Sequence, residues 1–528
     1  MEDSDNLKTQ MKKLSLLVLG LAFACNTSQK TVSEVAKTQP VADPVPYAES
    51  ITETELKEHL YTYASDEFEG RETGKPGQKK AVEYIKAHYE SLNIPAAQSN
   101  GNYFQKVALQ ETKVPKGNVT FNNESFSLGE HAVAFSPAQG TFNEIVYAGF
   151  GIEDGDHNDY NGIDVSGKLV LIKAGEPQNT DGTYVISGDQ EKSDWSNMSE
   201  AMGKKSTLAL EKGAKGVLYF DSQNFPRFRG YFRFMESNNS GRMQLADDSN
   251  NDILIVLDEK AATTLFENIE KDHTPKTITA NVNLSLTGSN DNIDSENVVA
   301  LLKGTEKPEE YVVISSHLDH IGVTADGQIN NGADDDGSGT VALLEIAQAF
   351  KQAAEEGKGP KRSIVFLHVT GEEKGLLGSK YYTDVEPVFP LKNTVANLNI
   401  DMIGRIDPKY EGSRNYLYLI GSDKLSTELH NLSEEVNKKY TNIEFDYTYN
   451  DENDPNRFYY RSDHYNFAKN NIPIIFYFNG THADYHRPSD TPDKINYDLL
   501  ENRSRLIFHT AWEIANRPNR LVVDKATE

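Results

Sequence analysis

Acidic residues and histidines follow four successive apolar segments in the second half of the sequence, and these are the residue types that could do chemistry. The segments are 311–315, 362–369, 395–400 and 472–478. They are followed in turn by His317 and Asp319, by Glu372 and Glu373, by Asp401, and by His482, Asp484, Tyr485 and His486. A loop after the first segment adds Asp334, Asp335 and Asp336.

Such a group of residues is typical of a metal centre. Carboxylates that converge without compensation repel one another, and a divalent cation removes that conflict. A mixed set of imidazole and carboxylate ligands suits zinc, with cobalt or manganese as substitutes. The candidates exceed the needs of one tetrahedral ion, whereas two ions that share a bridging carboxylate would use them. Each segment alone is compatible with a solvated turn or a helix cap, but four successive strand ends of this kind are not explained in that way.

The elements that must position these residues alternate along the chain. The four apolar segments predict strands, and the intervening sequence predicts helices over 339–350, 424–440 and 497–515. This alternation predicts an α/β fold with a mixed, largely parallel central sheet flanked by helices. Sites in such sheets form at the carboxyl ends of the strands, so we expect the acids and histidines to converge at one edge.

Residues 116–289 have a different sequence pattern from the rest of the chain. Short β-like runs alternate there with clusters of Gly, Asn and Asp, and no candidate catalytic residues are grouped together. We interpret this stretch as an inserted, β-rich region. The catalytic domain would then be discontinuous, formed by residues 51–115 and 290–520.

The N-terminus indicates export. Lys12 and Lys13 precede an apolar run over 14–24, which is too short to span a bilayer and is typical of a secretory signal. Cys25 follows directly, and the ending resembles a bacterial lipobox, with Ala22 where Leu is usual. We therefore predict a signal and lipobox over 1–25 with lipidation at Cys25, and a linker over 26–50. The protein would be exported and lipid-anchored to a bacterial membrane, either periplasmic or at the cell surface, with its start at Met1 or Met11.

Composition narrows the class of partner. Lys and Arg total 53 against 80 for Asp and Glu, a net charge of -27, which would repel nucleic acid and anionic membrane surfaces. We therefore expect no nucleic-acid partner, and membrane contact only through the N-terminal lipid. The apolar fraction of 37% is sufficient for sizeable cores, so global disorder is not expected.

The motifs resemble those of the M28 zinc metallopeptidases, a family that includes secreted bacterial aminopeptidases. They occur in the order of that family: His317-x-Asp319, the glycine-flanked acidic run 332–339, Gly371-Glu-Glu, Asp401, and Tyr485-His486-x-Pro488. The early loop with Glu69, Gly70 and Arg71 also looks like its opening segment. Within 116–289, the sequence looks like a protease-associated domain, whose implied role is to cover or shape the cleft.

The resemblance implies roles for these residues. His317 and Asp401 would bind one zinc ion, Glu373 and His486 a second, and Asp335 would bridge the two. Glu372 would be the general base, Tyr485 would donate a hydrogen bond to the oxyanion, and Asp319 would accept a hydrogen bond from His317. From the residues alone, the last ligand stays open among His464, His482 and His486. The family also tends to have a cis peptide after the bridging residue, here between Asp335 and Asp336.

The predicted function is therefore a two-zinc exopeptidase that removes N-terminal amino acids from peptide substrates. Three alternatives are weighed against it: a carboxypeptidase or dipeptidase of glutamate-carboxypeptidase type, a glutaminyl cyclase with one zinc, and a receptor-like homologue without activity. The carboxypeptidase would need basic residues in its pocket, for which Arg405, Arg461 and Arg487 are candidates. The sequence leaves the side-chain preference and the oligomeric state open.

Overall fold

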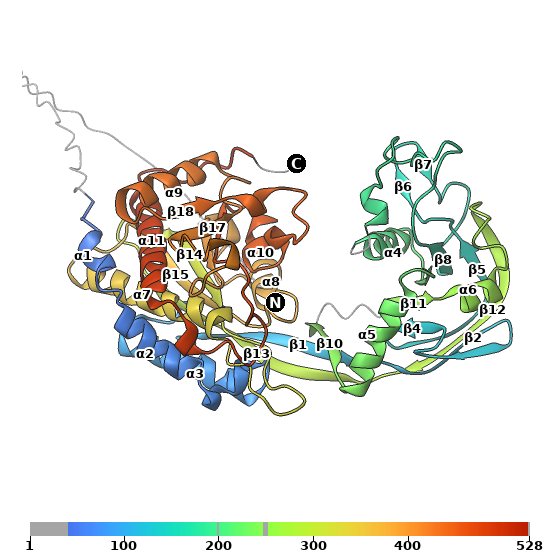
Figure 1. Cartoon of the computed structure of the whole chain (residues 1–528), viewed down its shortest axis with the longest axis horizontal. Helices are drawn as coiled ribbons and strands as arrows, with labels where there is room; N and C mark the ends of the chain where they lie inside the picture. The colour runs from blue at the N-terminus through green and yellow to red at the C-terminus, as the bar shows by residue number, and fades with distance from the viewer. Residues whose placement is uncertain (1–40, 198–199, 247–251, 526–528) are drawn as a thin grey trace, which may run out of the picture. The chain divides into compact units, whose positions relative to one another are not determined.

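The computed structural model describes residues 41–197, 200–246 and 252–525 (Figure 1). The predicted signal, Cys25 and most of the predicted linker lie outside these residues. Among the described residues, no helix has both the length and the apolar character needed to cross a bilayer.

A nine-stranded mixed sheet carries the candidate site, with its strands in the order β10-β1-β13-β15-β14-β16-β19-β17-β18. The strands are β1 (Phe104–Lys113), β10 (Gly241–Leu245), β13 (Asn290–Leu302), β14 (Lys307–His317), β15 (Arg362–Val369), β16 (Thr394–Ile400), β17 (Tyr416–Ile420), β18 (Glu444–Asp446) and β19 (Ile474–Phe478). The central four, β15, β14, β16 and β19, are parallel. Strands β13 and β17 flank them in antiparallel directions. The predicted α/β fold with a mixed sheet is thus confirmed.

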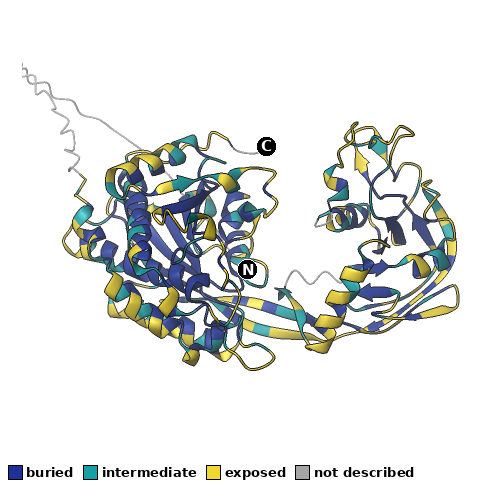
Figure 2. Cartoon of the chain, viewed as in Figure 1, coloured by how far each residue is buried: buried dark blue, intermediate teal, exposed yellow. Residues whose placement is uncertain are grey.

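Helices cover both faces of the central strands, which explains why these strands are buried along most of their length. Phe366 of β15 stacks on Tyr89 of α3, whereas its neighbours Val365 and Leu367 pack with Phe467 of α10. Because successive side chains of a strand point to opposite faces, α3 and α10 lie on opposite sides of the sheet. Figure 2 shows the resulting buried centre. The helices of this part are α2 (Glu53–Tyr63), α3 (Pro76–Ser91), α7 (Gly339–Glu355), α8 (Leu377–Lys380), α9 (Thr427–Tyr440), α10 (His464–Ala468) and α11 (Tyr497–Asn516).

A second sheet of eight strands lies within the middle of the chain, in the order β3-β2-β12-β5-β8-β9-β11-β4. Its strands are β2 (Lys116–Phe121), β3 (Glu124–Ser127), β4 (Ala132–Ala134), β5 (Ala138–Tyr147), β8 (Leu169–Lys173), β9 (Gly216–Phe220), β11 (Ile253–Leu257) and β12 (Lys276–Thr287), with helices α4 (Ala201–Glu211), α5 (Phe225–Ser237) and α6 (Glu259–Leu265). Strands β6 (Glu153–Asp154) and β7 (His157–Asn158) form a separate ribbon. Strand β10 falls within 116–289 yet pairs with β1 in the nine-stranded sheet, so this stretch also contributes to the other sheet.

The last residues of the linker predicted over 26–50 are packed against the rest of the protein. Helix α1 (Val45–Ala48) is short, but Tyr47 and Ala48 are buried. The ring of Tyr47 stacks on Trp512 of α11, and its hydroxyl donates a hydrogen bond to Glu356. The prolines of this segment had indicated a flexible linker, and the sequence did not show that Tyr47 would pack against Trp512.

Candidate metal centre

The loops after the four parallel strands meet at one edge of the sheet. His317 ends β14, Asp401 directly follows β16, and Glu373 follows β15. Asp335 lies in the turn that leads into α7, and His486 follows β19. Because the strands are parallel, their carboxyl ends share an edge, and these five side chains converge there.

One group of ligand atoms forms around the end of β14. The His317 Nε2 atom lies 3.2 Å from Asp335 Oδ1 and 3.5 Å from Asp401 Oδ1. All three side chains are buried, and their ligand atoms are close enough together to share one cation.

A second group shares Asp335 with the first. Glu373 Oε1 lies 2.8 Å from His320 Nδ1, and Asp335 Oδ2 lies 3.8 Å from the same nitrogen. His486 Nε2 approaches from the other side, 3.0 Å from Asp335 Oδ2 and 3.1 Å from Glu373 Oε2. The five predicted ligands are thus brought together, with Asp335 common to both groups. His320, to which the sequence analysis assigned no role, joins the second group.

The residues fit divalent cations. The buried atoms His317 Nε2 and Asp335 Oδ2, which belong to the two groups, form no hydrogen bond among the described residues. Imidazole nitrogens and carboxylate oxygens are ligands that zinc accepts, and a carboxylate with one oxygen toward each group can bridge two ions.

Electrostatics support the same conclusion. Burial alone would lower the pKa of His317, but Asp401, Glu372 and Asp335 raise it well above its usual value. The pKa of His486 rises to about 10 despite burial, because the carboxylates of Asp335 and Glu373 lie 3.0 and 3.1 Å from its Nε2 atom. In the metal-free chain, protonated histidines therefore balance the negative charge of the crowded carboxylates. Bound cations would balance the same charge in their place.

Buried polar contacts hold the acidic loop in place. Asp336 accepts hydrogen bonds from the backbone N–H groups of His317, Gly339 and Met402, which belong to three different segments. The Asp335–Asp336 peptide is cis, as the family resemblance implied. Asp490 accepts from the N–H of Asp335 and thereby ties the β19 loop to the same turn.

Arg71 fixes the start of this turn from the opposite side. Its buried guanidinium donates to the carbonyls of Asn331 and Gly332, and also to that of Tyr63 in α2. Gly332 has a φ of 53°, and a Cβ there would collide with the carbonyl of Asp335, so the turn requires glycine.

Asp319 departs from its predicted contact. The His317 Nδ1 atom is 3.1 Å from the backbone carbonyl of Asp319, whereas the nearest carboxylate oxygen is 3.9 Å away. The carboxylate instead accepts from the hydroxyl of Thr73 and from the backbone N–H of Glu372. The carbonyl is thus the group that orients His317, and the carboxylate positions the segment that carries Glu372.

Glu372 and Tyr485 border a small pocket beside the two groups, together with Asp335 and Asp401. Burial, together with Asp401, Glu373 and Asp463, raises the pKa of Glu372 well above its usual value. Tyr485 stacks on His486 with ring centroids 3.9 Å apart, and its hydroxyl has no hydrogen-bond partner among the described residues. Both side chains are therefore placed to reach a group bound in this pocket.

The other histidines near the site have structural partners. His464 donates from Nε2 to the carbonyl of Tyr459, stacks on Phe476 and has a pKa lowered to about 3 by burial. His482 pairs with Asp334 at 3.1 Å. His368 contacts the hydroxyl of Tyr89 within the core, as a packed sheet residue would. Of the three histidines left open from the sequence, His486 is the one that contacts Asp335 and Glu373.

Sequence reasoning gave no role to two groups at the site. His320 was visible as the third residue after His317, but only its contact with Glu373 shows that it faces the same space. Asp463 lies deeper, where burial raises its pKa to about 7 and where its Oδ2 atom has no hydrogen bond within the described part of the chain. No spacing in the sequence distinguishes it from a helix-capping aspartate.

Comparison with known proteins agrees with this geometry. The sequence profile of peptidase family M28 matches residues 297–511, the stretch that contributes every residue of the two groups. Residues 297–511 form a peptidase family M28 domain. The four parallel strands and the site at their carboxyl ends lie within this match, whereas β1 and β10 of the same sheet lie outside it.

Curated relatives of the chain include both amino- and carboxypeptidases. The probable leucine aminopeptidase 2 of Aspergillus oryzae is 28% identical over 263 residues, 46% of this chain and 48% of the relative. Aminopeptidase YwaD of Bacillus subtilis is 30% identical over 152 residues, 26% and 31% of the two chains. The probable glutamate carboxypeptidase LAMP1 of Arabidopsis thaliana is 33% identical over 120 residues, 23% of this chain and 16% of the relative. The matches thus cover half or less of each of these relatives.

The fold as a whole also has a solved counterpart. An aminopeptidase from Aneurinibacillus sp. strain AM-1 superposes with a TM-score of 0.53 at 20% identity, covering 92% of this chain and 99% of that one. The shared architecture therefore includes residues outside 297–511.

Proposed function

We propose that the chain is a metal-dependent exopeptidase that removes N-terminal amino acids from peptides, with two zinc ions held around Asp335. The observation that carries the proposal is the shared carboxylate: Asp335 contacts His317 in one group and His486 in the other. Glu372 borders the same pocket. The M28 domain and the aminopeptidases among the relatives support this activity.

The residues of the chain have distinct parts in this reaction. His317, Asp401 and Asp335 would hold one ion, and Glu373, His486 and Asp335 the other. When bound, divalent ions supply Lewis-acid chemistry, which acidifies water and polarises a carbonyl. Glu372 takes the proton of the attacking water and passes it to the leaving amine, the two transfers of a general base and acid. Tyr485 donates its free hydroxyl to the developing oxyanion.

The pocket beside Glu372 indicates which side chain would be accepted. Met402, Phe458, Phe476 and Phe478 form an apolar wall that continues into a buried aromatic cluster. An apolar wall favours an apolar side chain on the residue released, since burial of apolar surface contributes roughly 25 cal/mol per Å².

The arginines weigh against a carboxypeptidase that selects acidic residues. Arg405 is held by Asp484 at 2.9 Å and by Asp490 at 3.7 Å, so it is not free for a substrate. Arg487 does not line the pocket beside Glu372. Arg461 does line it, with its guanidinium 4.9 Å from the centre of the Phe458 ring. A pocket with one arginine and an apolar wall fits an aminopeptidase better than a carboxypeptidase that binds acidic C-terminal residues.

The test compares Glu372→Gln with the exposed substitution Glu435→Gln. Glu372→Gln should lower the cleavage of a leucyl chromogenic amide by roughly 10²-fold or more, since a general base contributes about that much. Zinc per chain should stay near two, and Glu435→Gln should change neither quantity. High residual activity in Glu372→Gln would refute the assignment of the base.

A second arm separates the two exopeptidase classes. A peptide with a free N-terminus and a C-terminal amide should be cleaved, whereas the N-acetylated peptide with a free C-terminus should not. The reverse pattern would favour the carboxypeptidase.

We further propose export with a lipid anchor at Cys25, supported by the basic pair and apolar run that precede it. Labelled palmitate should be incorporated into the wild-type chain and not into Cys25→Ala when both are expressed in a bacterial host. Equal labelling of the two would contradict the anchor. We also propose that residues 116–289 contain a protease-associated domain, supported by the apolar core on each side of the eight-stranded sheet.

A further inference from the structure

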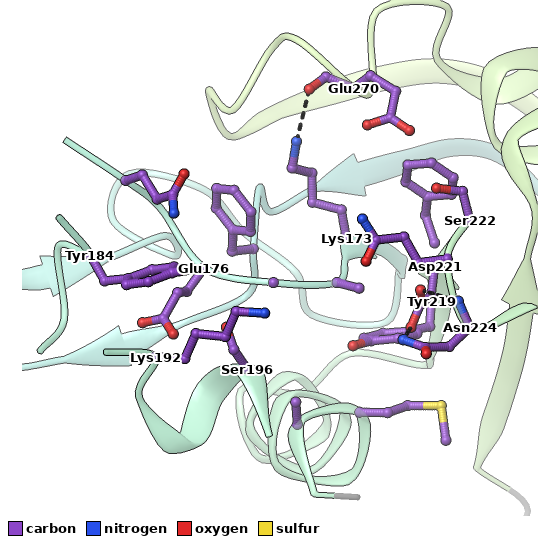
Figure 3. A pocket seen from close by; sticks show the side chains of 18 of the residues that line it. Lys173, Glu176, Tyr184, Lys192, Ser196, Tyr219, Asp221, Ser222, Asn224 and Glu270 are labelled. Carbon is purple, nitrogen blue, oxygen red and sulfur yellow. Dashed lines mark hydrogen bonds between the residues drawn. The ribbon is translucent and has the colours of Figure 1, made fainter. Parts of the chain in front are cut away.

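A pocket of about 590 Å³ lies at one edge of the eight-stranded sheet (Figure 3). Strand β8 ends at Lys173, and Asp221 follows β9, so both residues stand at the carboxyl ends of neighbouring parallel strands. This is the edge at which ligands bind in open α/β sheets. The volume falls within the range of small-molecule sites, roughly 300–1,000 Å³.

The pocket is lined by buried charges of both signs without ionic partners. Lys173, Glu176 and Asp221 are only 6%, 5% and 6% exposed. None of them forms an ion pair within 4.0 Å among the residues that the structure describes. Lysine, glutamate and aspartate are almost never fully buried unless they are paired, because an isolated buried charge loses its hydration.

Neutral groups satisfy these charges only in part. Lys173 Nζ donates to the carbonyls of Ile269 and Glu270, at 3.3 and 3.1 Å. Glu176 accepts from the N–H and hydroxyl of Ser193, and Asp221 accepts from the N–H and the amide of Asn224. Each carboxylate can accept about four hydrogen bonds, so capacity remains on both.

Further polar groups face the same space. Tyr219 is 2% exposed and points into the pocket, and its hydroxyl has no hydrogen-bond partner among the described residues (Figure 3). The hydroxyl of Ser196, which also lines the pocket, is buried and forms no hydrogen bond with any residue that the structure describes. Lys192 extends from an exposed loop toward the same volume (Figure 3). Buried polar groups left unpaired around a cavity indicate that a ligand supplies the missing partners.

We propose that this pocket binds a zwitterionic ligand of the peptide class, a free amino acid or a short peptide. The carboxylates of Glu176 and Asp221 receive the ammonium group, and Lys173 and Lys192 receive the carboxylate. Tyr219 adds a hydrogen bond. A neutral sugar would leave all four charges unpaired, and a metal cation would be repelled by the two lysines.

The aromatic lining fits the remainder of such a ligand. Phe150, Tyr184 and Phe228 supply apolar surface among the charged groups, which suits a side chain or a peptide plane. The proposal does not depend on the metal centre, because every residue that it uses lies between 150 and 270, outside the M28 domain.

The experiment measures calorimetric binding of leucyl-leucine to the full chain after removal of metal ions with a chelator. This treatment prevents hydrolysis and removes metal-dependent binding at the other site. We expect saturable binding of one dipeptide per chain. Asp221→Asn keeps the acceptor for Asn224 but removes the charge, and Lys192→Met changes an exposed residue. Each should weaken binding roughly tenfold or more, the equivalent of one charge-assisted hydrogen bond.

Matched controls lie in the same region of the chain. Asp164 is exposed and accepts from a turn N–H as Asp221 does, and Lys116 is exposed on β2. Asp164→Asn and Lys116→Met should leave the affinity unchanged, and the N-acetylated dipeptide amide, which lacks both charges, should not compete.

Three results would overturn the proposal. They are no binding at millimolar dipeptide, unchanged affinity in Lys192→Met, or equal binding of the uncharged analogue. Loss of peptidase activity in Glu372→Gln bears only on the metal centre, so the two proposals fail separately.

Discussion

Arg71 offers a quantitative test of how the fold holds the metal centre. The side chain is 1% exposed and belongs to a loop far from the acidic run in sequence. Its guanidinium donates at 2.7 Å to the carbonyl of Asn331 and at 2.8 Å to that of Gly332, immediately before the turn that carries Asp335. Replacement of Arg71 by Met keeps an unbranched apolar stem but removes every donor.

The expected loss follows from the contacts. Three hydrogen bonds disappear, including the one to Tyr63, and each contributes about 1 kcal/mol net. We therefore expect the free energy of unfolding of the metal-free chain to fall by about 3 kcal/mol. The turn is no longer held from this side, so zinc affinity should fall by roughly 10–100-fold, as for other groups that orient ligands.

Arg505 provides the matched control. It also donates to backbone carbonyls, those of Ala48, Glu49 and Ile51, but none of these residues adjoins a candidate ligand. Urea unfolding and zinc titration against a chromophoric chelator would be measured for both variants. Arg505→Met should lose stability without losing zinc affinity. The reasoning fails if Arg71→Met binds zinc as tightly as the wild type, or if Arg505→Met weakens zinc equally.

Other consequences can be measured in parallel. Asp335→Ala should lose both zinc ions, and retention of two ions per chain would exclude the bridge. Phe458→Ala removes a ring from the apolar wall and so enlarges the pocket. The ratio of kcat/KM for tryptophanyl substrates to kcat/KM for alanyl substrates should therefore rise roughly tenfold. An unchanged ratio would place the side-chain pocket elsewhere. Burial lowers the pKa of Lys205 from 10.5 to about 7, so the unfolded chain binds more protons between these values and stability should rise with pH there. Lys205→Met should reduce that slope by ~1.4 kcal/mol per pH unit in urea unfolding, and an unchanged slope would contradict the assignment.

The central strands were predictable from sequence because both of their faces are buried. β14, β15 and β16 contain short apolar runs, and these strands are buried along most or all of their length, as in a parallel sheet covered on both faces. By contrast, β13 begins with exposed polar residues and β1 alternates polar and apolar positions, and their mutual pairing extends the sheet. The short strands β17 and β18 were not predicted either; β17 is a buried apolar run of five residues, and β18 has only three residues.

The site was predictable in its membership but not in its contacts. The order of acids and histidines at strand ends indicated which residues converge, because parallel strands share an edge. Sequence could not show that the carbonyl of Asp319, rather than its carboxylate, contacts His317. The carboxylate is directed elsewhere because the hydroxyl of Thr73 and the backbone N–H of Glu372, from two other segments, donate hydrogen bonds to it.

The sequence by itself determined that acids and histidines would gather at the end of a parallel sheet, since strand direction follows from local apolar pattern and connection length. Tertiary structure alone decided which atoms meet: His320 with Glu373, Arg71 with the turn before Asp335, and Lys173 with Asp221 around one pocket. These partners are separated by tens to hundreds of residues. Their proximity results from the packing of whole strands and helices, which no local pattern encodes.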